Sequence, residues 1–259
     1  MTTIERLQTY LRQSAGQRYQ AVVVPPFSLF FHPSDSFAHF NYAIPNEPPA
    51  GDLTASLAAL RQTFAAQDRI PRFEFIAEFA PKLASTLEAG GFQLESQTML
   101  MVCSPEQYRP VPTVPQLTIT RLGEQAELAD IKTVMAVQHQ GFNGSQRKPV
   151  TDEEAANFQR QLAGTTYFLA RLAGQPAAAG SLIAPLDGLA EIAGITTLPP
   201  YRRRGIATAL TAAALQVAFD QGLEIALLTA ADETAGRIYE RAGFRPVATA
   251  LAYVELPDT

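Results

Sequence analysis

The stretch Leu198-Pro-Pro-Tyr-Arg-Arg-Arg-Gly-Ile-Ala207 decides how the chain is interpreted. It separates an apolar stretch that predicts a strand, residues 189–197, from apolar residues spaced for one buried helical face, residues 206–218. The start of a helix leaves backbone N–H groups unpaired and carries partial positive charge, so it favours an anion. Gly205 has no Cβ and lets a ligand approach the backbone closely. With three consecutive arginines beside it, this turn predicts an anion-binding loop, the alternatives being a basic helix cap or a patch that touches nucleic acid.

Strands and helices alternate on both sides of this loop. The patterns predict helices over 124–138, 152–162 and 234–242, and one that begins near residue 206 and ends before Gly222. Strands are predicted at 116–121, 166–172, 177–183, 189–197, 224–229 and 247–256. This order indicates an α/β sheet with helices on its faces.

A second conspicuous segment follows the loop, Ala235-Gly-Arg-Ile-Tyr-Glu-Arg-Ala-Gly-Phe244. It is similar to the Ala-x-x-x-Tyr-Glu-Lys-x-Gly-Phe segment of the GCN5-related N-acetyltransferases (GNAT). In the same way Arg202-Arg-Arg-Gly-Ile-Ala207 resembles the Gln/Arg-x-x-Gly-x-Gly/Ala signature of that family, and Pro199-Pro-Tyr201 resembles the Pro-Glu-Tyr that often precedes it. The resemblance implies a tandem acyl-CoA N-acyltransferase (GNAT) fold, with a mixed central sheet and helices on both faces.

The resemblance also implies a cosubstrate, acetyl-CoA. In the family the loop amides hold the coenzyme A pyrophosphate, and the last residues of the preceding strand bond the pantetheine arm through their backbone. Asp232 stands where the family often has an asparagine near the coenzyme. The implied coenzyme-binding residues are Thr197, Leu198, Arg202, Arg203, Arg204, Gly205, Ile206, Ala207, Thr208 and Asp232.

Acetyl transfer to an amine needs two proton movements, because the substrate ammonium must lose a proton and the departing thiolate must gain one. In relatives a tyrosine of the second segment often supplies the latter, which makes Tyr239 the expected general acid. Glu191, on the strand before the loop, is the expected base, acting through a water. The competing interpretations are a core tyrosine and an exposed strand carboxylate.

The chain also repeats itself. Leu83-Ala-Ser-Thr-Leu-Glu-Ala-Gly-Gly-Phe92 corresponds to the second segment, with Phe92 and Phe244 152 residues apart, and further upstream the offset becomes 148. We therefore expect two related domains, residues 1–112 and 113–259, joined by the proline-rich stretch 105–115. Residues 117–138 have no counterpart in the first repeat.

The first repeat lacks the residues of the expected site. Leu53, Leu87 and His39 stand opposite Gly205, Tyr239 and Glu191. The stretch 46–52 is acidic and proline-rich where the second repeat is basic, so it is expected to repel a pyrophosphate. We expect a degenerate, non-catalytic GNAT-like domain that supports the second one or forms a wall of its substrate cleft.

Composition limits the other possibilities. The 259 residues carry a net charge of −5, which argues against a nucleic-acid binder, and the single cysteine excludes an internal disulfide. The three histidines, His32, His39 and His139, lack metal-ligand spacing, so no metal is expected. No signal peptide is recognisable and no apolar run reaches the ~18 residues of a membrane helix, so a cytoplasmic protein is expected.

Taken together, the sequence predicts an enzyme that transfers an acetyl group directly from acetyl-CoA to a primary amine. Two alternatives stay open at this point, a transferase that uses another acyl-CoA donor and a non-catalytic acyl-CoA sensor. The identity of the amine and the oligomeric state are not encoded in any pattern, because acceptor pockets arise from variable loops.

Overall fold

The computed structural model describes residues 1–33, 35–143, 149–160 and 163–256, which form two compact units. The first unit contains residues 1–100 together with the C-terminal segment from Val247, and the second contains residues 101–246. These bounds differ from the expected domains, 1–112 and 113–259, at both ends of the second repeat. No helix among the described residues is long and apolar enough to cross a membrane.

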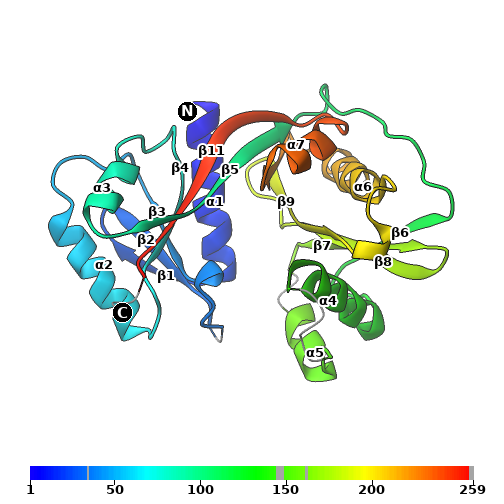
Figure 1. The fold of residues 1–259 in the computed structure, drawn as a ribbon, viewed down its shortest axis with the longest axis horizontal. Helices are drawn as coiled ribbons and strands as arrows, with labels where there is room; N and C mark the ends of the chain where they lie inside the picture. Colours follow the sequence, from blue (N-terminus) through cyan, green and yellow to red (C-terminus); the bar gives the residue numbers. More distant parts are fainter. Residues whose placement is uncertain (34, 144–148, 161–162, 257–259) are drawn as a thin grey trace. The chain divides into compact units, whose positions relative to one another are not determined.

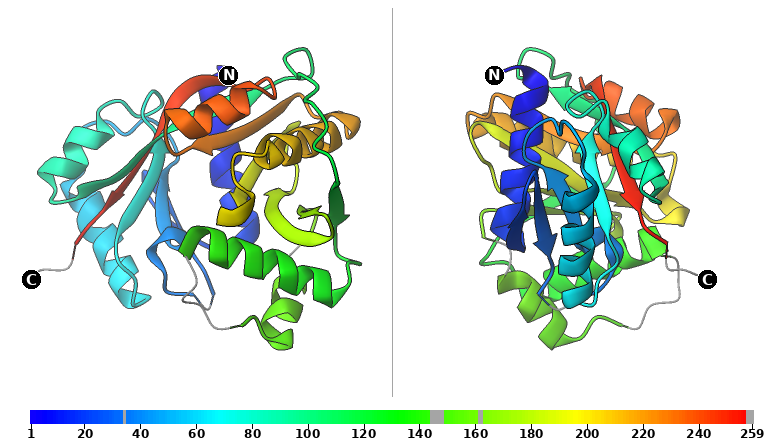
Figure 2. Two further views of the ribbon diagram at one scale, coloured as in Figure 1. Left: turned by 45° about the vertical axis from the view of Figure 1, so that its right-hand side comes forward. Right: turned by 90° about the vertical axis from the view of Figure 1, so that its left-hand side faces the viewer.

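The first unit is an α/β layer with helices on both faces of its strands. The helix α1 lies on one face, where its Ala15 packs with Phe30 and Tyr42, and α2 and α3 cover the other face around Phe73 (Figure 2). The strand order is β1-β2-β3-β4-β11-β5, in which β11 (Arg245–Val254) is the last strand of the chain. Its elements are α1 (Thr3–Arg18), β1 (Gln20–Val24), β2 (Phe27–Phe31), η1 (Ala38–Phe40), β3 (Tyr42–Pro45), α2 (Thr54–Ala66), β4 (Arg72–Ile76), α3 (Leu83–Ala89) and β5 (Gln93–Cys103).

The second unit has the strand order β5-β10-β9-β8-β7-β6. Its elements are β6 (Leu117–Leu122), α4 (Leu128–Asn143), α5 (Asp152–Arg160), β7 (Thr166–Leu172), β8 (Gln175–Leu182), β9 (Leu189–Thr197), η3 (Pro199–Tyr201), α6 (Ile206–Asp220), β10 (Ile225–Ala230) and α7 (Glu233–Glu240), and β11 (Arg245–Val254) follows. Successive residues of β8 face opposite layers, because Ala179 packs in the cluster with Val134 of α4 while Gly180 lies against Leu210 of α6 (Figure 1). The predicted mixed sheet with helices on both faces is confirmed.

Most predicted elements of the second repeat are present within two or three residues of their expected bounds. The main difference is α4, which begins at Leu128 rather than at residue 124, because Glu124 to Gln125 form a turn, and which continues to Asn143 rather than ending at residue 138. The end of the predicted helix over 152–162 falls on residues 161–162, which lie outside the described residues.

The internal repeat is visible element by element. The strands β2 and β8 begin 148 residues apart, at Phe27 and Gln175, and the helices α2 and α6 begin 152 residues apart, at Thr54 and Ile206. The first unit begins with α1, the counterpart of α5, so β6 and α4 are the additional leading piece that the sequence indicated.

The last strands of the two repeats are exchanged, which explains the unexpected unit bounds. We expected a strand at 247–256 to complete the second domain, but β11 pairs antiparallel with β4, with Leu251 opposite Phe75. Its counterpart β5 leaves the first unit after Leu100, and its last residues belong to the second unit, where β5 is the neighbour of β10. Each strand therefore completes the sheet of the other repeat.

The strands β9 and β10 pair over a short distance only, and this divergence positions the site. Their parallel ladder covers Leu189 to Glu191, while β9 continues to Thr197. A bulge shifts the β8–β9 register between Ala179 and Ser181, and Gly194 takes the left-handed conformation there, with φ +63°. The final part of β9 thus has a free edge toward β10.

Candidate active site

The start of α6 is uncapped by the protein itself. Gly205 is the N-cap residue, with φ +80° and ψ 0°, and no side chain accepts a hydrogen bond from the first helical amides. Among the described residues, no acceptor lies within bonding distance of the amides of Ile206, Ala207 or Thr208. These N–H groups are the orphan donors of a helix start, and here they are left for solvent or a ligand.

The chain also leaves space at this turn. A Cβ built on Gly205 would meet nothing closer than the Cγ2 of Val114, at 3.5 Å. Arg203 takes the left-handed conformation as well, with φ +62°, which costs a non-glycine residue about 1–2 kcal/mol. Such strained conformations concentrate at functional turns.

The three arginines of the loop are exposed. In the described part of the chain none of them pairs with a carboxylate, although Arg202 donates from Nε to the carbonyl oxygen of Thr197 at 3.0 Å. Arg204 borders a cavity of about 480 Å³ together with Tyr201 and Val114. The loop therefore presents uncompensated positive charge beside the free amides, which is the electrostatic environment that an anion needs.

The end of β9 supplies polar groups next to the loop. The amide of Leu198 donates to the carbonyl oxygen of Ala177 at 2.9 Å, so it points toward β8. Because the peptide groups of successive strand residues face opposite edges, the backbone of Thr197 faces the free edge of β9. The Oγ1 atom of Thr197 is buried and has no hydrogen-bond partner among the described residues. Thr197 and Leu198 are the two predicted pantetheine contacts. The backbone of Thr197 faces the free edge of β9, whereas the amide of Leu198 is bonded to β8. The hydroxyl of Thr197 is a further group at this edge, which the sequence did not single out.

Asp232 is the N-cap of α7, and its carboxylate accepts a hydrogen bond from the amide of Ala235 at 2.8 Å. This contact gives the residue a structural function independent of any ligand, and it explains why a carboxylate is acceptable where the resemblance favours asparagine, since both cap helices well.

Tyr239 lies on α7 with its ring against Phe244, at 6.2 Å between centroids. Burial raises the pKa of its phenol above the ordinary value and is the only cause of that shift. The group is therefore protonated throughout the neutral range, as a proton donor must be.

Glu191 is partly buried and lies opposite Leu227 in the last pair of the β9–β10 ladder. Its backbone carbonyl accepts from the amide of Ile183, the residue that follows β8, at 2.8 Å. The residue thus stands where the two strands begin to diverge, on the strand that also ends in Thr197.

Comparisons with known proteins identify the family of this part of the chain. The model of the acetyltransferase (GNAT) family matches residues 134–244, a range that contains the loop, Glu191 and Tyr239. Residues 134–244 belong to the acetyltransferase (GNAT) family. No curated protein matches the chain.

Solved structures extend the likeness of the GNAT domain to the whole chain. A GCN5-related N-acetyltransferase from Kribbella flavida is 27% identical, with a TM-score of 0.82, over 100% of this chain and 97% of that one. One from Sphaerobacter thermophilus is 17% identical (TM-score 0.65, 90% and 78% covered). A tandem GNAT protein from the clavulanic acid biosynthesis pathway is 14% identical (TM-score 0.63, 100% and 90% covered). The latter two likenesses concern the fold, and they agree with the duplicated architecture.

At the start of α2, the counterpart of α6, the chain's own carboxylate bonds the first helical amide. The carboxylate of Asp52 accepts hydrogen bonds from the amide of Thr54, at 2.9 Å, and from its hydroxyl, at 2.6 Å. These bonds lower the pKa of Asp52, which keeps it charged. Leu53, opposite Gly205, is buried in the core of this unit. The pattern Asp52-x-Thr54 is a recognisable Asx-turn signal just before the helix, and sequence reasoning noted only its negative charge.

Two other side-chain chemistries have no site in the described structure. Cys103 is buried, and burial raises the pKa of its thiol to about 12, so it is a poor nucleophile. Within the described ranges no three histidine, cysteine or acidic side chains gather as metal ligands would.

Proposed function

We propose that the GNAT domain transfers an acetyl group from acetyl-CoA to a primary amine in a single direct step. The observation that carries this proposal is the start of α6, where free amides, a left-handed glycine and unpaired arginines meet. A diphosphate is a dianion with several acceptor oxygens, and this arrangement supplies donors and positive charge without competition from the protein's own carboxylates.

Different groups of the loop bind different parts of the coenzyme. The amides of Ile206, Ala207 and Thr208 donate to the pyrophosphate, while the arginine side chains add charge at its exposed side. Gly205 keeps the space between backbone and ligand open. Thr197 offers its backbone, on the free edge of β9, and its unpaired hydroxyl to the pantetheine arm.

Acetyl-CoA supplies a thioester, whose carbonyl carbon is attacked by the neutral amine. The substrate ammonium first loses one proton to a base. The C–N bond then forms and the C–S bond breaks, the attacking nitrogen loses a second proton to solvent, and the sulfur receives a proton. Glu191, at the point where β9 and β10 diverge, accepts the amine proton through a water. Tyr239 gives its proton to the sulfur and regains one from solvent, and its raised pKa ensures that the proton is present at neutral pH.

The test separates binding from chemistry. Purified protein is titrated with acetyl-CoA in a calorimeter and then incubated with acetyl-CoA and a panel of amines, while free thiol and the mass of the acetylated amine are measured. The proposal expects micromolar binding and amine-dependent thiol release. Binding with no thiol release for any amine would contradict the transferase and support an acyl-CoA sensor, and absence of binding would contradict the site itself.

Acyl-donor choice is tested in the same assay. Replacing acetyl-CoA by propionyl-CoA, butyryl-CoA and succinyl-CoA, at equal concentration, compares kcat/KM between donors. The proposal expects acetyl-CoA to have the highest value, and a preference for a longer or charged acyl group would overturn the donor assignment while leaving the coenzyme loop in place.

A further inference from the structure

The two repeats exchange their last strands, and this exchange has consequences for what the first repeat does. The core of the first unit is completed by residues from the C-terminal end of the chain, because Tyr253 is buried there and stacks on Phe75, with Leu251 packed against the same cluster. In return, the end of β5 is buried in the second unit, where Met101 and Cys103 have no exposed surface.

Side chains of the first repeat hold β11 in addition to the strand pairing. Arg61 on α2 bonds the carboxylate of Glu255 at 2.6 Å, and the hydroxyl of Tyr253 donates to Glu88 on α3 at 2.7 Å. Glu78 accepts the amide of Thr249 with both carboxylate oxygens. These contacts join positions about 165 to 194 residues apart in the sequence.

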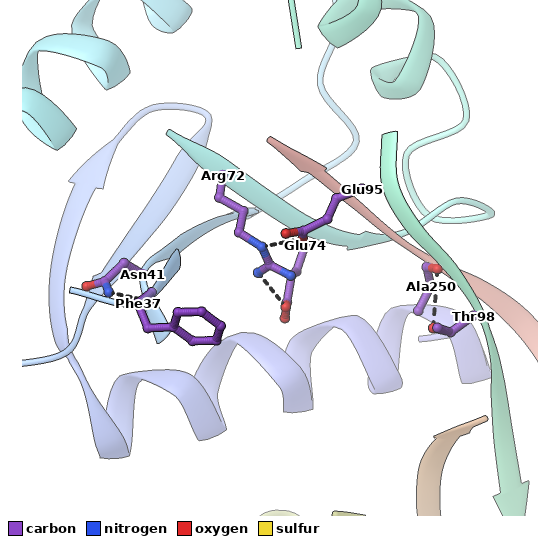
Figure 3. Close-up of polar contacts among 7 residues, drawn as sticks. All are labelled: Phe37, Asn41, Arg72, Glu74, Glu95, Thr98 and Ala250. Atoms are coloured by element: carbon purple, nitrogen blue, oxygen red, sulfur yellow. Dashed lines mark hydrogen bonds and ion pairs between the residues drawn. The ribbon is translucent and has the colours of Figure 1, made fainter. Parts of the chain in front are cut away.

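The neighbour of β11 on its other side is β5, and these strands are linked as well. The hydroxyl of Thr98 donates to the carbonyl oxygen of Ala250, and the buried Arg72 of β4 pairs with Glu95 of β5 at 2.7 Å (Figure 3). The strand β11 is thus held between two strands of the first repeat and cannot leave without breaking both ladders.

The segment after β5 is bound to the GNAT domain in a corresponding way. The amide of Arg109 donates to the carbonyl oxygen of Ala242 at 3.0 Å, and Tyr108 packs edge-on against Phe219 of α6. Gly243 has no room for a Cβ, which would overlap the carbonyl oxygen of Gln107. In the first unit the carbonyl of Gly90, the counterpart of Ala242, accepts from Arg61. Arg61 also bonds Glu255, which follows β11, so each repeat holds a segment that the other one supplies.

We infer that neither repeat is a complete domain by itself, and that the first repeat is an obligatory structural part of the coenzyme-binding domain. Residues 1–112 supply β5 to the second unit, as the neighbour of β10, and residues 113–259 supply β11 to the first unit. The first repeat thereby completes the sheet whose β9 and β10 diverge at the candidate site. This function requires no chemistry of its own and is independent of the proposed acetyl transfer.

The experiment cuts the folded chain between the repeats. A recognition sequence for a specific protease is inserted between Pro112 and Thr113, which are both exposed, and the purified protein is cleaved without denaturant. The inference expects both fragments to elute together at the mass of the uncut 28.0 kDa chain, with β11 amides still protected from hydrogen exchange. Fragments that separate, or β11 amides that exchange as fast as those of a free peptide, would overturn it. Acetyl-CoA is absent from this measurement, so its outcome does not depend on the proposed function.

Variants test whether the exchanged strand itself holds the fragments together. Arg61→Met removes the bonds to Glu255 and Gly90, and it should accelerate dissociation of the cleaved complex by about tenfold. The matched control is Lys132→Met, which removes an ion pair with Asp152 of similar length, 2.7 Å, that lies wholly within the second repeat. Equal dissociation rates of both variants would show that the strand exchange does not join the repeats.

Discussion

The helices α2 and α6 occupy the same place in the two repeats, yet their starts have opposite electrostatic character. At α6 the amides are free, the preceding glycine is left-handed and three arginines surround the turn. At α2 the carboxylate of Asp52 accepts a hydrogen bond from the first helical amide, that of Thr54, and the side chain of Leu53 is buried in the core. By the repeat register, Asp52 corresponds to Arg204. The comparison teaches that the turn before a helix decides whether a repeat of this fold offers free amides and positive charge at that helix start.

The largest expected effect comes from filling the open turn. Gly205→Glu should weaken acetyl-CoA binding about 1000-fold or more, because it places a carboxylate in the space left for the pyrophosphate and strains a φ of +80°. Titration calorimetry measures the affinity. The matched control is Gly51→Glu, which strains a left-handed glycine of the corresponding loop in the first unit, at φ +76°, and should leave affinity unchanged.

A similar pair of glycines tests how the exchanged segments are bound. Gly243→Ala should lower the free energy of unfolding by about 3 kcal/mol, because the new Cβ meets backbone atoms of Gln107 and Tyr108 that cannot move aside. Its counterpart Gly91 has a similar left-handed φ and nothing within 4 Å, so Gly91→Ala should cost only about 1 kcal/mol. Urea denaturation of both variants gives the difference, and equal losses would contradict the close approach at Gly243.

The proposed general acid, Tyr239, has no counterpart in the first repeat, where Leu87 stands opposite it. Tyr239→Phe should lower kcat about 100-fold with little change in the KM for acetyl-CoA, because the ring remains while the proton is lost. Since burial raises the pKa of Tyr239, its proton stays in place as pH increases through the ordinary tyrosine range. The alkaline decline of wild-type kcat should therefore begin above pH ~10. An unchanged kcat in the phenylalanine variant would remove Tyr239 from the mechanism.

Much of this architecture could be predicted from the sequence, because it rests on local patterns. The apolar spacing after Ile206 fixed the bounds of α6, and the two glycine-phenylalanine pairs revealed the repeat. The exchange of β5 and β11 could not be predicted. The two strands are each other's counterparts in the repeat, so their sequences are similar, and only tertiary pairing decides which sheet each one joins. The bulge at Gly194 and the unpaired hydroxyl of Thr197 depend on three-dimensional packing in the same way.

A carboxylate introduced before α6, at the position that Asp52 has before α2, tests the comparison directly. Arg204→Asp places an acidic residue two positions before α6, as Asp52 stands before α2, and should weaken acetyl-CoA binding about 30-fold. The loss should exceed that of Arg204→Ala, which removes charge without adding a competitor for the amides. The melting temperature should not fall, because the new carboxylate can accept the amide of Ile206 as Asp52 accepts that of Thr54. A variant that binds as well as Arg204→Ala would show that capping plays no part.

The smallest effect is expected from the reverse change. Asp52→Asn keeps a side-chain oxygen that can accept the amide of Thr54 while removing the charge, so the melting temperature should fall slightly at pH 7. The hydrogen bonds from Thr54 lower the pKa of Asp52 in the folded protein, so its contribution to stability is present above the unfolded-state pKa and is lost as pH falls through the folded value. The difference between variant and wild type should therefore vanish in acid. No second coenzyme site should appear in titrations of the variant, because Leu53 still fills the place of Gly205 and no arginine stands beside it. A second equivalent of bound acetyl-CoA would mean that the carboxylate of Asp52 alone prevents the first repeat from binding the coenzyme. The buried Leu53 would then contribute nothing to that difference.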